Sequence, residues 1–231
     1  MKTRDIDFDT WLKRWPRVFK QSQHVTVIGP TGCGKTTLVT ELVEPRANVA
    51  TLGVKFRDET MEKLVTKRGY KRVFDWNKKG SATRVALWPK ASDLDTLMDE
   101  HRKVFKPCIN DIYKVGAWCL WLDEMRYMSE HLGMKKSLTL MYIAARSNNI
   151  SLVGNTQRPA WVPLEAYSQA GHLIMFRTGD ERDLLRIGSL NGANPRDVAN
   201  AVANLPDKHT FVHIDLSDPQ VMNITKQPKP K

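Results

Sequence analysis

Short apolar runs alternate with amphipathic stretches along the chain, and this order predicts the fold. The apolar runs are four to six residues long and are predicted to be strands: His24–Ile28, Val49–Val54, Arg84–Trp88, Ala117–Leu122, Ile150–Val153, His172–Phe176 and Thr210–Ile214. Several are almost entirely apolar, which is typical of strands that helices cover on both faces.

Between these runs lie stretches with helical patterns. The predicted helices are Lys35–Val43, Asp58–Thr66, Ser92–Phe105, Lys135–Arg146, Glu181–Ile187 and Asn194–Ala203. The last one starts with an N-cap asparagine followed by a first-turn proline, which is a common helix start. Strands that alternate with helices indicate an α/β fold in which a mainly parallel sheet lies between two helical layers.

The first predicted strand leads into Gly29-x-x-x-x-Gly34-Lys35-Thr36, and the first predicted helix follows at once. Glycines let the backbone curl around phosphate oxygens, while the N–H groups of the loop and of the helix start point at them. In such a loop Lys35 reaches the β- and γ-phosphates, and the Thr36 hydroxyl ligates Mg²⁺. The sequence therefore predicts a site for Mg²⁺ with a nucleoside triphosphate, formed by Gly29, Pro30, Thr31, Gly32, Cys33, Gly34, Lys35, Thr36 and Thr37.

A second acidic element follows the strand Ala117–Leu122, which ends in Asp123 and Glu124. A carboxylate at the end of a neighbouring strand can hold Mg²⁺ directly or through water, and this is the role expected of Asp123. Glu124 is then placed to activate the attacking water as a general base. A water-activating base favours a hydrolase over a small-molecule kinase.

The balance of charge indicates a polyanionic partner, because the net charge is +11 and the pI is near 9.6. The excess is concentrated in residues 55–90, which hold eleven basic and four acidic residues, a net charge of +7. This concentration favours nucleic acid over a solvated basic surface. The candidate DNA contacts are Lys55 and Arg57, after the second strand, and Lys78 and Lys79, in the loop around Trp76.

No membrane segment or export signal is expected. The longest apolar run, Val115–Leu122, has 8 residues, whereas a bilayer needs about 20. The N-terminal residues scatter charges where a signal peptide needs an apolar core. The three cysteines show no metal-type spacing and no pairing, which fits a reducing cytoplasm.

Domain organisation follows from the same patterns. The 231 residues suffice for one sizeable core, and no repeat or composition change divides them. We expect residues 1–23 to be an N-terminal helical extension, residues 24–215 a P-loop domain, and residues 216–231 a basic, flexible tail. The tail ends in Lys-Gln-Pro-Lys-Pro-Lys, where the prolines interrupt regular structure.

Three motifs together resemble the FtsK–HerA superfamily of ring-forming, DNA-pumping ATPases: "GPTGCGKTT" at Gly29–Thr37, "LWLDEM" at Leu120–Met125 and "TQRP" at Thr156–Pro159. The similarity spans about residues 25–188. The chain lacks the membrane segments and DNA-reading end domain of FtsK and the large insertions of HerA. It is therefore most similar to the viral branch, whose members package double-stranded DNA into preformed capsids.

The resemblance implies a RecA-like ASCE fold (the P-loop class with an additional strand and a catalytic glutamate), ATP as the nucleotide and a pentameric or hexameric ring. It also implies that Gln157 senses the γ-phosphate and that Arg146 reaches the nucleotide of the neighbouring subunit. Arg158 is the second candidate for that arginine, and Arg146 could instead serve only as a helix C-terminal cation. A capsid portal and a location in the host cytoplasm or at the capsid vertex follow from the same branch.

Two other functions are compatible with these motifs. One is a P-loop nucleoside or nucleotide kinase, which Glu124 and the basic middle segment disfavour. The other is a nucleotide-dependent scaffold on DNA or at a capsid vertex, with negligible turnover.

Overall fold

The computed structural model describes residues 1–231 except 91–92, 159–160, 189–193, 220 and 230–231. Its strands form a single ten-stranded sheet in the order β1-β10-β9-β8-β2-β7-β6-β3-β5-β4. The strands are β1 Lys2–Asp5, β2 Val25–Ile28, β3 Val49–Leu52, β4 Lys71–Val73, β5 Arg84–Leu87, β6 Cys119–Leu122, β7 Ser151–Thr156, β8 His172–Phe176, β9 Thr210–Asp215 and β10 Val221–Lys226.

The sheet is mainly parallel, as the sequence predicts. From β8 to β4 every neighbouring pair of strands is parallel, and only β9 runs antiparallel to its two neighbours. All the parallel strands therefore end at one edge of the sheet, which we call the carboxyl edge. Strand β7 lies between β2, which leads into the glycine loop, and β6, which ends in the two carboxylates.

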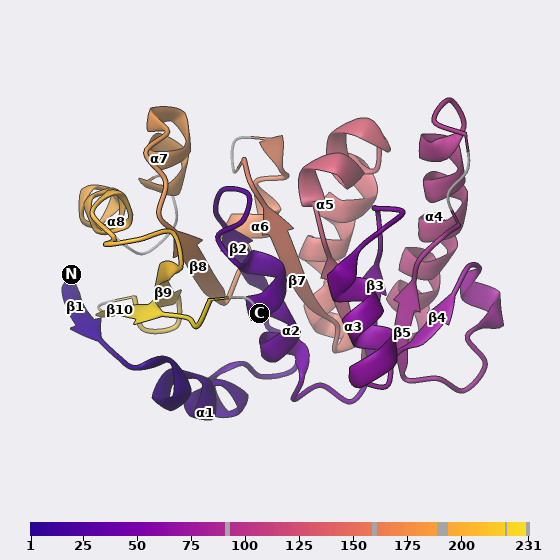
Figure 1. The fold of residues 1–231 in the computed structure, drawn as a ribbon, viewed down its shortest axis with the longest axis horizontal. Coiled ribbons are helices and arrows are strands. Elements are labelled where there is room, and N and C mark those ends of the chain that lie inside the picture. The colour runs from indigo at the N-terminus through magenta and orange to yellow at the C-terminus, as the bar shows by residue number, and fades with distance from the viewer. Residues whose placement is uncertain (91–92, 159–160, 189–193, 220, 230–231) are drawn as a thin grey trace.

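Helices cover both faces of the sheet (Figure 1). Buried residues of α1, α2 and α3 pack on one face, and those of α4, α5, α6 and α8 pack on the other. The helices are α1 Phe8–Val18, α2 Lys35–Val43, α3 Glu59–Lys67, α4 Leu97–Val115, α5 Lys135–Ala144, α6 Glu165–Ser168, α7 Glu181–Gly188 and α8 Pro195–Ala203, with short 3-10 or π turns η1 Trp76–Lys78, η2 Tyr127–His131 and η3 Ala145–Asn148. None of the helices in the described ranges is long and apolar enough to cross a membrane.

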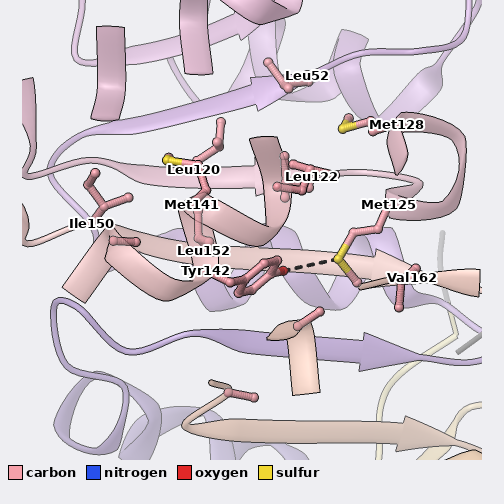
Figure 2. Packing of buried hydrophobic residues seen from close by; sticks show 14 of the residues in the cluster. Leu52, Leu120, Leu122, Met125, Met128, Met141, Tyr142, Ile150, Leu152 and Val162 are labelled. Carbon is pink, nitrogen blue, oxygen red and sulfur yellow. Dashed lines mark hydrogen bonds between the residues drawn. The ribbon is translucent and has the colours of Figure 1, made fainter. Parts of the chain in front are cut away.

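Alternate residues of the central strands face opposite layers, because successive side chains of a strand point to opposite sides. Leu120 and Leu122 of β6 join the core under α4 and α5, whereas Trp121 packs in the core of the other face. Figure 2 shows the first of these cores, where the Tyr142 hydroxyl donates to the Met125 sulfur at 3.2 Å. A Cβ at Gly154 would stand 2.2 Å from that sulfur, so any larger residue there would require Met125 to move.

Helix α1 is fastened to the sheet by a chain of hydrogen bonds through two histidines. The Trp11 indole N–H lies 3.0 Å from His213 Nδ1, and His213 Nε2 lies 3.3 Å from His172 Nδ1. Burial, together with the neighbouring His172, lowers the pKa of His213 to about 3. Both histidines are buried, so α1 depends on neutral rings.

The predicted strands all form, and their ends differ by only a few residues. Helix α4 runs ten residues past the predicted end at Phe105, with Pro107 inside it. The predicted start of that helix at Ser92 lies outside the described residues. The sequence analysis missed β1, β4 and β10, three short or peripheral strands.

The prediction of a flexible tail over residues 216–231 is wrong for residues 221–226. These form β10, which pairs antiparallel with β9 and parallel with β1. The expected boundary at residue 215 therefore falls inside the sheet, and β1 joins the N-terminal extension to it. The helical part of that extension is present as α1.

Candidate nucleotide site

The glycine loop lies between the end of β2 and the start of α2, at the carboxyl edge of the sheet. It contains the predicted nucleotide-binding residues Gly29, Pro30, Thr31, Gly32, Cys33, Gly34, Lys35, Thr36 and Thr37, the last three being the first turn of the helix. Gly32 and Gly34 have φ angles of 75° and 101°, in the left-handed region that favours glycine. The loop thus has the backbone form that a phosphate-binding turn requires.

Lys35 lies folded against this loop and is only 7% exposed. Its ammonium donates to the carbonyl oxygens of Gly29 at 2.8 Å and Pro30 at 2.9 Å. The cation is therefore held where the loop closes, at the position from which it can reach the terminal phosphates of a nucleotide.

Asp123 is placed beside the first turn of α2 by the pairing of β6 with β7. Its Oδ1 accepts from the Asn155 amide at 2.7 Å and lies 3.4 Å from the Thr36 hydroxyl. Burial, together with the charge of the adjacent Glu124, raises the pKa of Asp123 to about 6. Asn155 Oδ1 is buried without a hydrogen-bond partner.

These oxygens fit Mg²⁺ bound together with a nucleotide. Mg²⁺ is usually held by one or two protein oxygens plus water and phosphate oxygens, and Thr36 and Asp123 supply such a pair. A buried carboxylate without a cation beside it is costly, which is the cause of its raised pKa. Among the described residues, no group of three or more His, Cys, Asp or Glu side chains is arranged to hold a metal ion.

Glu124 is joined to the glycine loop by a short relay of side chains. Gln157, just after β7, donates to Glu124 Oε1 at 2.8 Å, and its own oxygen accepts from the Thr31 hydroxyl at 2.8 Å. Glu124 also has a φ of 63°, which is uncommon for a residue other than glycine and costs free energy. The structure thus brings the predicted base, the predicted γ-phosphate sensor and the phosphate loop into direct contact.

Two residues that the sequence analysis missed also contact the loop. The Gln227 amide donates to the Cys33 carbonyl at 2.8 Å, and His209 Nδ1 lies 3.1 Å from the same oxygen. Both side chains are buried, Gln227 at 3% exposure and His209 at 8%. Gln227 stands just after β10, where the sequence analysis expected a flexible tail, so no signal in the pattern marked it.

A cavity of about 390 Å³ opens beside Glu124 and Gln157. Lys55 lines it together with Arg126 and His131, and the charge of Lys55 lowers the pKa of Asp123 against the effect of burial. Lys55 therefore lies beside the residues of the candidate nucleotide site. It follows β3, and β3 pairs directly with β6, which carries Asp123 and Glu124.

The four candidate DNA contacts do not lie together. Lys55 and Arg57 are exposed after β3, at the carboxyl edge. The Lys79 ammonium lies 5.5 Å from the ring of Trp118, which precedes the first residue of β6 and so marks the opposite edge. Lys78 and Lys79 therefore stand about one strand length away from the other pair. Trp76 is buried, so it anchors this turn.

The two candidate arginines also stand at opposite edges. Arg146 is exposed in η3, before the first residue of β7, whereas Gln157 follows the last residue of that strand. About 20 Å of strand thus separates Arg146 from the P-loop of its own chain. Arg158 is at the carboxyl edge and pairs with Asp180 and, at 3.4 Å, with Asp183.

The fold is similar to that of solved nucleotide-binding proteins. The genome packaging NTPase B204 from Sulfolobus turreted icosahedral virus 2, in complex with AMPPCP, has a TM-score of 0.64 and 18% identity, over 90% of this chain and 98% of that one. The DNA-packaging ATPase B204 from Sulfolobus turreted icosahedral virus has a TM-score of 0.62 and 20% identity, over 91% and 99%. The pCW3 conjugation coupling protein TcpA, with ATPgS, has a TM-score of 0.57 and 14% identity, over 89% of this chain and 60% of that one.

No protein-family model and no curated protein matches the sequence. The likeness to the solved structures therefore concerns the fold, and it confirms the predicted one: a three-layer RecA-like ASCE fold with a mainly parallel sheet. In its fold the chain is thus similar to viral genome-packaging ATPases, as the sequence analysis expected.

Proposed function

We propose that the protein is an ATP-hydrolysing motor that forms a ring and moves double-stranded DNA. The observation that carries this proposal is the relay from Thr31 through Gln157 to Glu124, next to a phosphate loop and a buried aspartate. A base held by a residue that also contacts the loop suits a reaction in which water attacks a bound terminal phosphate.

In this proposal each side chain has one role. The loop N–H groups and Lys35 bind and orient the phosphates. Thr36 and Asp123 would hold Mg²⁺, which would offset the negative charge of the phosphates. Glu124 accepts the proton of the attacking water, and Gln157 orients that carboxylate. When a γ-phosphate lies against the loop, Gln157 is positioned to exchange its contact with Thr31 for one with phosphate.

The ring is proposed from the resemblance to ring-forming ATPases, in which a neighbouring subunit supplies an arginine to the nucleotide. Within this chain Arg126 lines the cavity beside Glu124 and Gln157. Arg158 is already paired with two carboxylates. Arg146 is exposed at the opposite edge of the sheet, where it can serve only the site of another subunit. Pentamer or hexamer is proposed from the same resemblance. A head-to-tail contact that each subunit repeats can close such a ring.

DNA is proposed to contact the carboxyl edge around β3, β4 and β5. Arg57 lies 5.9 Å from the ring of Phe56, which is 60% exposed, and Lys90 lies 5.2 Å from that of Phe74, which is 44% exposed. Trp88 joins the two groups by donating to the Lys55 carbonyl. Exposed cations at one edge can neutralise successive phosphates without reading sequence, as a pump requires.

Packaging of a viral genome is the proposed task, with a capsid portal as partner and the host cytoplasm or the capsid vertex as the location. The support is the likeness of fold to the B204 packaging proteins, together with the net charge of +11.

Phosphate release measured with and without double-stranded DNA tests the proposal. Hydrolysis that DNA stimulates supports the motor. Transfer of the γ-phosphate to a nucleoside instead of water would identify a kinase, and binding without turnover would identify a nucleotide-dependent scaffold.

A further inference from the structure

The strand that replaces the expected tail ends directly above the phosphate loop. After Lys226, the last residue of β10, Gln227 turns inward and its backbone N–H donates to the His209 carbonyl at 3.1 Å. Lys226 pairs with Asp207 at 2.6 Å on the outside. The backbone of Gln227 is thus held by its own hydrogen bond to His209 and by the ion pair of the preceding Lys226.

Two donors converge on one acceptor at the Cys33 carbonyl. This oxygen belongs to the peptide that joins Cys33 to Gly34, and no peptide in the described chain is cis. In a trans peptide the carbonyl and the N–H point in opposite directions. Donors that hold the Cys33 carbonyl from outside therefore aim the Gly34 N–H into the loop, and they polarise the peptide so that this N–H becomes a stronger donor.

The space around Gly34 leads to the same conclusion. A side chain at this position would stand 1.8 Å from the Gln227 amide nitrogen, so the glutamine occupies the volume next to the loop. Glycine is thus required here by the φ of 101° and by the contact with Gln227. The contact is buried, and a buried amide is kept only when it is hydrogen-bonded.

From these contacts we infer that Gln227 and His209 are positioning residues of the phosphate loop, and that the C-terminal segment is part of the nucleotide site. This inference rests on the proposed nucleotide binding. It predicts that Gln227 affects the binding of the phosphates and not of the nucleoside. The effect should therefore be the same whatever nucleoside the phosphates carry.

The test measures the Kd of ATP and of inorganic triphosphate, each with Mg²⁺, for the full chain. Gln227→Ala should weaken both ligands by about 3- to 10-fold, the size of one hydrogen bond. Gln227→Glu should weaken both by more, because a carboxylate cannot donate to a carbonyl and repels phosphate. Lys229→Ala, which removes an exposed charge from the same segment, is the matched control and should change neither Kd by more than about 2-fold.

The thermal midpoint of each variant without ligand separates lost affinity from lost stability. It should fall most for Gln227→Glu, because that variant buries a carboxylate without a donor. Unchanged affinities in both Gln227 variants would overturn the inference, as would weakened ATP with unchanged triphosphate, since that pattern places Gln227 at the nucleoside. A wild-type chain that binds neither ligand would instead overturn the proposed function itself.

A second inference comes from two exposed surfaces at opposite ends of α4, a helix of 19 residues and so about 28 Å long. Near its C-terminus, α4 and α5 form an apolar groove of about 260 Å³ that includes Tyr113, Leu140 and Ile143. These three are 43%, 63% and 56% exposed. Exposed lysines extend the groove: Lys106 is four residues before Asn110, and Lys136 is four before Leu140.

The other end of α4 has the complementary character. The segment from Asp93 to Asp99 exposes Leu94 at 83% and Met98 at 45%. Asp93 and Asp95 make it acidic, and Asp99 pairs with Arg102 at 2.5 Å. Leu97, in the same segment, lines the cavity that Glu124 and Gln157 also line. An acidic apolar segment beside the nucleotide site thus matches a basic apolar groove beside Arg146.

The geometry points to a head-to-tail contact in which the segment 93–99 of one subunit occupies the α4–α5 groove of the next copy of this chain. The contact is heterologous, as a closed ring requires. Arg146 lies three residues after Ile143 of the groove. The contact therefore also brings Arg146 of one subunit towards the Glu124 cavity of the subunit whose segment 93–99 occupies its groove. This inference rests on the proposed ring.

Sedimentation of the full chain with Mg²⁺ and ADP tests the surface. Lys136→Glu and Asp95→Lys should each reduce assembly, and the two together on one chain should restore it, because the charges then exchange places. Leu185→Asp alters an apolar residue of α7 that is 69% exposed and should leave assembly unchanged. A monomeric wild type, or assembly that neither single variant weakens, would overturn the inference.

Discussion

At the scale of single residues, the sequence indicated the chemistry and the structure supplied the contacts between its parts. The motifs predicted Lys35, Thr36, Asp123 and Glu124, because a phosphate loop and a strand-end carboxylate pair have fixed spacings. No sequence pattern shows that Gln157 bridges Glu124 and Thr31, or that Gln227 lies over Gly34. Such contacts join residues more than 30 positions apart, so only the pairing of strands defines them.

Glu124 is the residue whose replacement tests the proposed chemistry. Glu124→Gln keeps the size of the side chain but removes the base, so hydrolysis should fall by about 10²–10⁴-fold while ATP binding remains. Single-turnover hydrolysis and nucleotide titration of the same sample measure the two effects. Glu130→Gln, an exposed glutamate on η2, serves as the control. Near-normal turnover in Glu124→Gln would remove Glu124 from its role.

At the scale of elements, the strands and helices with strong apolar patterns were predicted and the edge strands were not. β1 has the residues Lys-Thr-Arg-Asp, all exposed, and β4 has three residues. Such strands form because a neighbouring strand offers hydrogen bonds, and their own side chains carry little information about burial. The position of α1 was equally unpredictable. It depends on the hydrogen bonds that link Trp11 to His213 of β9 and His213 to His172 of β8.

The docking of α1 should make stability fall as the pH falls. The pKa of His213 is about 3 in the folded protein and about 6.5 in the unfolded chain, so the unfolded chain binds more protons between these values. The contribution is complete above pH 6.5 and is lost as the pH falls towards 3. From pH 7.5 to pH 5 it should lower the free energy of unfolding by roughly 1–2 kcal/mol. Urea unfolding at the two pH values measures this change.

The control for that measurement is a variant without the titrating ring. His213→Gln should be less stable at pH 7.5 but should lose less stability on acidification than the wild type. The exposed His131→Gln variant should follow the wild type at both pH values. An equal loss in His213→Gln and the wild type would place the pH dependence elsewhere.

At the scale of the whole molecule, fold class and charge were predictable from the sequence, but the positions of the partner-binding residues were not. The clustering of basic residues in 55–90 is real in sequence, yet the fold sends Lys55 and Lys79 to opposite edges of the sheet. Crossover connections in a parallel sheet carry the chain from one edge to the other, so neighbours in sequence need not be neighbours in space.

DNA contact should therefore depend on the carboxyl edge. Arg57→Ala/Lys90→Ala should reduce the slope of log affinity against log salt by about 1.8, since each phosphate contact contributes about 0.9. Basal hydrolysis should change little, whereas its stimulation by DNA should be lost. Lys78→Ala, at the opposite edge, is the matched control. A salt slope that stays the same in the double variant would place the DNA elsewhere.

Mixing two inactive variants tests the contribution of the neighbouring subunit. Arg146→Ala alone should bind ATP but lose most of its turnover, because an arginine supplied by a neighbour is worth about 10³–10⁵-fold in comparable phosphate-transfer systems. Rings mixed from Arg146→Ala and Glu124→Gln subunits should regain activity, since some boundaries then carry both intact groups. Mixed rings without any recovery at every ratio would contradict a role for Arg146 across the boundary.

The central claim is that hydrolysis drives movement along double-stranded DNA. Displacement of a triplex-forming strand from linear duplex DNA measures this movement directly, because only a protein that travels along the duplex removes the third strand. The account predicts displacement by the wild type with ATP and Mg²⁺, at a rate that falls with the distance to the triplex. It predicts none with Glu124→Gln. Hydrolysis that DNA stimulates without any displacement, or displacement that Glu124→Gln also produces, would contradict the account.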